Sequence, residues 1–231
     1  ATFGGRDFLL TRIAAALPAG TELHWGSAEG PASGPLELRD VRYVQRGCPD
    51  VDGEPVPYGQ CAQPTVLTFT AARVLLNPEI TPLIGRRLRL DALEVDGAVL
   101  DLPAPADTPF ELPTWPEVLP RIELPLSLQA DAIRVDGLRV TRAGAPLVDI
   151  ATIRAGLDAR QGQLDVNDLV VESDRGRFTA HGTYAPADNY RTDLTVTALL
   201  PAPFPQPRPR LGLVARGDLD LMDVAVSGHA P

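Results

Sequence analysis

Lysine is absent from this sequence of 231 residues, so every one of its 21 basic residues is arginine. The 30 acidic residues outnumber them and give a net charge of −9, and no basic cluster offsets it. This balance argues against a nucleic-acid-binding protein. Histidine occurs 3 times, and no two histidines share a short motif. Motifs of serine hydrolases, zinc proteases and phosphate-binding loops are also missing. We therefore expect no enzyme activity, no cofactor and no metal.

Long apolar runs are missing too. No stretch is long enough to cross a membrane as a helix, and no signal peptide is visible. Aromatic residues make up only 5% of the chain, which leaves few large side chains to fill a solid core between two sheets. We expect a fragment of a longer protein that forms one continuous unit over residues 1–231.

Alternation of apolar and polar residues is the most regular feature that is present, in a phrase that occurs twice. It reads LRLDALEVDGAVLDLP over Leu88–Pro103 and LSLQADAIRVDGLRVTR over Leu126–Arg142. Every second residue of a strand lies on the same face. The phrase therefore predicts antiparallel strands that are apolar on one face and charged on the other.

Two interruptions in each phrase keep the apolar residues on one face. Asp-Gly, at Asp96–Gly97 and Asp136–Gly137, is a strong signal for a two-residue hairpin turn. The Asp-Ala pair at Asp91–Ala92 lies too close to be a second turn, and we interpret it as a β-bulge that bends the strand.

Looser copies and further alternating runs bring the total to about a dozen strands. One helix is expected over residues 5–18, ended by Pro18. Residues 102–125 and 201–210 are rich in proline and predict extended connections. The looser copies and further strand candidates are 36–43, 64–76, 148–159, 164–174, 176–185, 190–200 and 219–228.

The apolar face needs a cover, and a single helix cannot cover a dozen strands. The sheet could pack on a second sheet, close into a barrel, or curl into an open groove. The aliphatic composition favours the groove, with an ordinary sandwich core as the alternative. The predicted fold is all-β: a curled antiparallel sheet (an open groove, or β-taco) with one short N-terminal amphipathic helix. The predicted groove-lining residues are Leu88, Leu90, Leu93, Val95, Leu100, Leu102, Leu126, Leu128, Ile133, Val135, Leu138, Val140, Leu164, Val166, Leu169, Val171, Leu194 and Val196.

Two cysteines flank the loop CPDVDGEPVPYGQC, Cys48–Cys61. Its acidic residues suggest a calcium loop, but the ligand spacing of an EF-hand is missing. Structural zinc would need two more ligands, and none lies nearby. We therefore expect a disulfide between Cys48 and Cys61, which indicates an oxidising compartment.

The segment LPAGTELHWGSAEGPASGPLELRDVRY, Leu17–Tyr43, resembles the opening of the TamB family, which is similar to AsmA-like proteins with repeating β-grooves. The first phrase, its Pro-rich insert and Leu119–Ile150 resemble the same family further along. The resemblance implies a periplasmic protein of Gram-negative bacteria, held in the inner membrane by an N-terminal helix that this chain lacks. It also implies a TamA-like outer-membrane barrel partner, contacted through regions outside the chain.

From the resemblance and the aliphatic face together, we expect a bridge-like groove for phospholipid transport between the two membranes, with a role in outer-membrane biogenesis. The alternative is a chaperone-like scaffold that assembles outer-membrane β-barrel proteins and autotransporters by β-augmentation.

Overall fold

The computed structural model describes residues 10–15, 17–31, 34–48, 56–61, 63–79, 87–104, 127–203 and 205–229. Almost all of its regular structure is β-strand, as the alternating pattern predicts. The strands are β1 Thr21–His24, β2 Ser27–Glu29, β3 Leu36–Gly47, β4 Thr65–Glu79, β5 Arg87–Leu102, β6 Ser127–Arg142, β7 Ala145–Arg160, β8 Gln163–Ser173, β9 Gly176–Ala185, β10 Arg191–Leu199, β11 Arg210–Gly217 and β12 Met222–His229.

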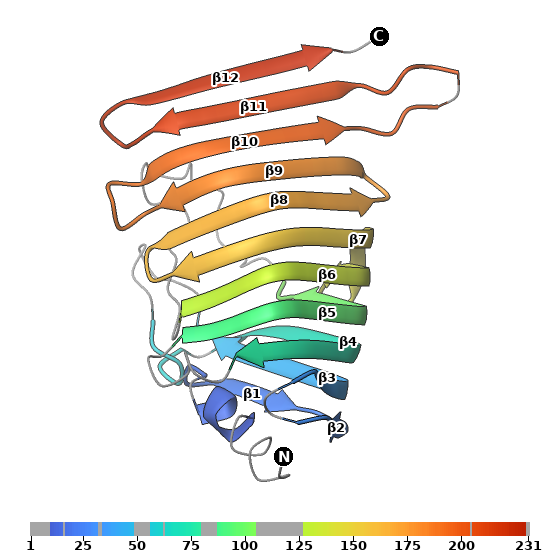
Figure 1. Cartoon of the computed structure of the whole chain (residues 1–231), viewed down its shortest axis with the longest axis vertical. Helices are drawn as coiled ribbons and strands as arrows, with labels where there is room; N and C mark the ends of the chain where they lie inside the picture. The colour runs from blue at the N-terminus through green and yellow to red at the C-terminus, as the bar shows by residue number, and fades with distance from the viewer. Residues whose placement is uncertain are drawn as a thin grey trace.

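All 12 strands belong to one sheet, in the order β1-β3-β4-β5-β6-β7-β8-β9-β10-β11-β12, with β2 paired to β3. Strands β1 and β12 lie at opposite ends of this sheet (Figure 1), and the described strands do not close on themselves. The prediction of an open, curled all-β sheet is confirmed. No second sheet occurs among these strands, so the sandwich alternative does not apply to this part of the chain.

The hairpin turns predicted at Asp96–Gly97 and Asp136–Gly137 are wrong. Both pairs lie inside long strands, and the two phrases run side by side as β5 and β6, paired in parallel with Val95 opposite Val135. Gly97 and Gly137 have φ values of 61° and 73°. Each has a left-handed backbone conformation that glycine tolerates, and the pairing skips it together with the residue opposite, without a shift of register. The apolar residues on either side stay on one face, as they would around a two-residue turn. The alternation of apolar and polar residues alone could not distinguish a hairpin turn from an interruption within one strand.

The parallel pairing of β5 and β6 also corrects the expectation of a purely antiparallel sheet; all other described pairs are antiparallel. A parallel pair cannot be joined by a tight turn and needs a crossover connection. The first Pro-rich segment lies between β5 and β6 in the chain, and residues 105–126 lie outside the described part. The second Pro-rich segment joins β10 to β11.

Interruptions of the strand pairing, some of them β-bulges, line up across neighbouring strands and bend the sheet. The pairing skips Asp40, Ala72, Gly97, Gly137 and Ala151 in successive strands from β3 to β7. A second set interrupts the pairing at Asp91 and Asp131 and in β7 and β8. Each bulge adds local twist and bend, and the bends are visible along β5–β8 (Figure 1). The bulge predicted at Asp91–Ala92 is thus present in register with its counterpart in β6.

The best-packed core lies at the N-terminal end of the sheet. Residues 10–15 form a helical turn within the helix predicted at 5–18; residues 5–9 and Ala16 lie outside the described part. From this turn, Leu10 and Ile13 pack on the apolar residues of β3 to β6, including Leu38 and Val95. Cys48 and Cys61 form the predicted disulfide, with their Cα atoms 5.6 Å apart. Within the described residues, no helix has the length and apolarity needed to span a membrane.

Candidate functional site

One face of the sheet is apolar from β3 to β12, and cross-strand pairing shows its continuity. Paired residues of neighbouring strands lie on the same face. One such row begins at Leu38 and Val74, continues through Val95, and ends at Leu211 and Gly228; its intervening members are Val135, Ile153, Val171, Phe178 and Ala198.

The bulges do not transfer residues to the other face. Opposite the bulge at Asp91, β4 alternates regularly, so Leu76 and Pro78 place Leu93 and Leu90 on one face. Strand β8 is regular opposite the bulge between Ile150 and Thr152 in β7, and β9 is regular opposite the bulge between Val166 and Leu169 in β8. The residues on either side of these two bulges therefore also stay on one face. All predicted lining residues from β5, β6, β8 and β10 therefore share this face; Leu126 lies outside the described residues. Whether they contact lipid stays a prediction.

Side-chain exposure on the apolar face rises from β3 toward β12. Val95 and Ala98 are buried, whereas Leu211, Val224 and Val226 are 46%, 58% and 70% exposed. No other described strand or helix covers the β10–β12 end. The predicted set missed the contributions of β3, β4, β7, β9, β11 and β12 to this face. The alternation in 148–159 and 219–228 could have identified the residues of β7 and β12. The residues missed include Leu38, Val74, Leu76, Val148, Ile150, Ile153, Leu157, Phe178, Leu211, Leu213, Val224 and Val226.

The opposite face is polar and carries ion pairs between neighbouring strands. Arg73 on β4 donates to Glu37 on β3 at 3.0 Å and to Asp96 on β5 at 2.7 Å. Similar pairs join β5 to β6, β6 to β7, β7 to β8, β8 to β9 and β10 to β11. Exposed pairs of this kind contribute little individually. They give the sheet one charged and one aliphatic face.

Glu37 and Asp101, two carboxylates on this polar face, have lowered pKa values. The hydrogen bond from Arg73 lowers the pKa of Glu37. The hydroxyl of Thr141 and the backbone N–H of Gly144 both donate to Asp101 and lower its pKa. In both cases the hydrogen bonds stabilise the ionised form. These groups join adjacent strands, and each shift has a structural cause.

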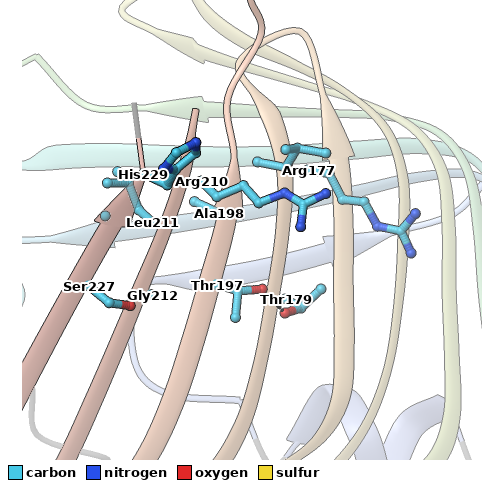
Figure 2. A pocket seen from close by; sticks show the side chains of 11 residues that line it. Arg177, Thr179, Thr197, Ala198, Arg210, Leu211, Gly212, Ser227 and His229 are labelled. Carbon is cyan, nitrogen blue, oxygen red and sulfur yellow. Dashed lines mark hydrogen bonds between the residues drawn. The ribbon is translucent and has the colours of Figure 1, made fainter. Parts of the chain in front are cut away.

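A hollow of about 530 Å³ lies on the polar side of β9–β12, at one end of these strands. Two cross-strand rows form most of it: Arg177, Leu199, Arg210 and His229, and then Thr179, Thr197, Gly212 and Ser227. Figure 2 shows the Arg210 side chain extending across β10 in the direction of Arg177. This hollow was not predicted, because β11 follows a Pro-rich segment and was not recognised as a strand from the sequence.

The described residues contain no group of three or more His, Cys, Asp or Glu side chains that could hold a metal ion. The weak calcium-loop signal fell on residues 49–55, which lie outside the described part. His24, His181 and His229 lie on β1, β9 and β12, well separated in the strand order.

Comparisons with protein-family models, with curated proteins and with solved structures find no match for this chain. The fold and the two faces therefore define the class of protein: the described strands form one open β-sheet with a continuous aliphatic face.

Proposed function

We propose that this chain is a segment of a periplasmic, bridge-like lipid-transport protein whose aliphatic face holds phospholipid acyl chains. The observation that carries the proposal is the unbroken apolar face from β3 to β12, exposed toward β12. Exposed apolar surface of this extent is unusual in a monomer and marks binding surfaces. The ion-paired opposite face suits contact with water.

The energetics of acyl-chain transfer explain why such a face would be useful. Each CH₂ group removed from water gains about 0.8 kcal/mol, so a chain crossing an aqueous compartment needs apolar contact along the whole path. Parallel pairing of β5 and β6 places Leu93 beside Ile133 and Leu100 beside Val140. The phrase that occurs twice in the sequence thus extends the same aliphatic surface from β5 onto β6.

The cellular setting is part of the proposal. The Cys48–Cys61 disulfide is the kind of bond that persists in an oxidising compartment such as the periplasm. The resemblance to the TamB family adds an inner-membrane anchor and a TamA-like outer-membrane partner to the proposal. It also connects the groove to outer-membrane biogenesis.

Site-specific photocrosslinking to lipid tests the proposal. A photoreactive residue at Val196 would lie on the aliphatic face of β10, and one at Thr197, the next residue, would lie on the polar face. Leu138 and Arg139 form the same kind of matched pair on β6. We expect phospholipid adducts from Val196 and Leu138 only, identified by extraction and mass spectrometry. Equal labelling on both faces, or none on either, would contradict lipid transport.

A second candidate function rests on the edge of the sheet. Strand β12 pairs only with β11 among the described strands, and most of its residues are exposed. A free edge can add a strand from another protein. A scaffold for outer-membrane proteins would therefore slow amide hydrogen exchange across Met222–His229 when an extended barrel-strand peptide is added. A lipid path alone would leave those amides unchanged.

A further inference from the structure

The hollow on the polar side of β9–β12 carries positive charge in a chain that is negatively charged as a whole. Arg177 and Arg210 occupy one cross-strand row two strands apart, with His229 beside Arg210. Strand spacing puts the two arginine backbones roughly 10 Å apart. Two side chains of this length can reach one anion between them. The chain's net charge of −9 makes such a cluster unexpected as general surface charge.

Arg210 differs from most arginines of the polar face because no carboxylate of the described residues pairs with it. Arg216, on the same strand and the same face, pairs with Asp193 at 3.1 Å. Arg177 pairs with Glu172 at 3.5 Å, and its side chain remains 55% exposed. The hollow therefore contains one guanidinium without an acidic partner and a second one only loosely neutralised.

Hydroxyl groups and a glycine form the adjacent row. Thr179 and Thr197 contact each other through their hydroxyls, and Ser227 lies across Gly212 from Thr197. A Cβ atom at position 212 would lie 2.8 Å from the Ser227 Oγ atom. Glycine thus leaves open the space between the hydroxyls. Three hydroxyl groups border the same hollow as the two guanidinium groups, and two of their protons remain available because one is used between Thr179 and Thr197.

We propose that this hollow binds a phosphate ester. A guanidinium matches the geometry of phosphate oxygens and makes charge-assisted hydrogen bonds, which are stronger than neutral ones. The hydroxyls of Thr197 and Ser227 can donate to the remaining oxygens. A tetrahedral phosphate can accept hydrogen bonds from several strands at once. Exposure of the hollow suits a headgroup or a small soluble ester.

The phosphate site does not depend on lipid transport along the opposite face. Its phosphate could belong to a phospholipid headgroup at the ends of the strands or to a soluble ester. Glycerol 3-phosphate probes the shared chemistry, and vesicles of phosphatidylcholine with or without phosphatidylglycerol separate the two sources.

The first test is a calorimetric titration of the chain with glycerol 3-phosphate. We expect saturable binding that weakens as salt is added. Arg210→Gln should weaken it about tenfold, since a hydrogen bond between charged groups is lost. Gly212→Val should block the hollow without changing the net charge. Arg216→Gln is the matched control: it removes the same charge from the same strand and should change the affinity less than about twofold.

Absence of saturable binding by the wild-type chain would overturn the proposal, as would equal losses in the Arg210→Gln and Arg216→Gln variants. Phosphatidylglycerol-dependent vesicle binding that Arg210→Gln abolishes would assign the site to a lipid headgroup. Glycerol 3-phosphate binding without vesicle binding would assign it to a soluble ester. Lipid crosslinking at Val196 separately reports the fate of the proposed function, so either proposal can fail alone.

Discussion

The rise in exposure along the aliphatic face predicts that one substitution will have very different costs at its two ends. Val95 on β5 is 7% exposed and packs in the core with Leu38 and Val74, whereas Val226 on β12 is 70% exposed. Both lie on the same face. We consider Val95→Asp and Val226→Asp, with Val99→Asp as control; Val99 lies on β5 but on the polar face, 37% exposed.

The magnitudes follow from burial. Burying a valine side chain gains about 1.5–3 kcal/mol, and Val95→Asp loses nearly all of it. The new carboxylate must also be desolvated or protonated, which brings the expected loss to more than about 4 kcal/mol. At Val226 the carboxylate meets water and little apolar burial is lost, so we expect less than about 1 kcal/mol. Val99→Asp should also cost less than about 1 kcal/mol, because Arg139 lies opposite on β6.

Urea unfolding, monitored by circular dichroism, measures these losses in the free energy of unfolding. The transition midpoint should shift while the slope of free energy against urea concentration stays constant. A loss at Val226→Asp as large as that at Val95→Asp would show that the β12 end is covered. That result would refute the reading of an open aliphatic face. A loss at Val99→Asp equal to that at Val95→Asp would instead refute the assignment of the two faces.

Three further predictions concern the disulfide, the ion pairs and the edge. Cys48→Ser with Cys61→Ser should lower the free energy of unfolding by up to about 3 kcal/mol, as expected for a loop of this length. Labelling of both thiols without reductant would contradict the bond. Because Arg73 lowers the pKa of Glu37, this pair stabilises the fold above the unfolded pKa of glutamate and is lost as pH falls through the lowered folded pKa. Arg73→Gln should flatten that part of the stability–pH curve, and an unchanged curve would contradict the coupling. The free edge of β12 should cause concentration-dependent association, which Val226→Lys should reduce in sedimentation velocity; a wild-type chain that stays monomeric at high concentration would count against it.

The strand content, the two faces and the disulfide could all be predicted from the sequence because each depends on local chemistry. Alternation at Leu93 and Val95, or at Ile133 and Val135, is a property of a single strand and needs no knowledge of its neighbour. The cysteines flank a short loop rich in proline and glycine, so their pairing is also a local matter. Strand β11 was not predicted because it adjoins a proline-rich segment. The hollow between Arg177 and Arg210 was not predicted for the same reason.

Tertiary structure alone decided which strands pair and whether the sheet stays open. Asp-Gly suits both a two-residue turn and a left-handed interruption inside a long strand, and both keep the apolar residues on the same face. Only the pairing of β5 with β6 distinguishes them, and that pairing joins residues about forty positions apart. The sequence by itself determined that one face would be aliphatic. The order and curl of the strands decided that this face remains continuous and that its β12 end is left exposed, because pairing and curvature arise from contacts between strands rather than within them.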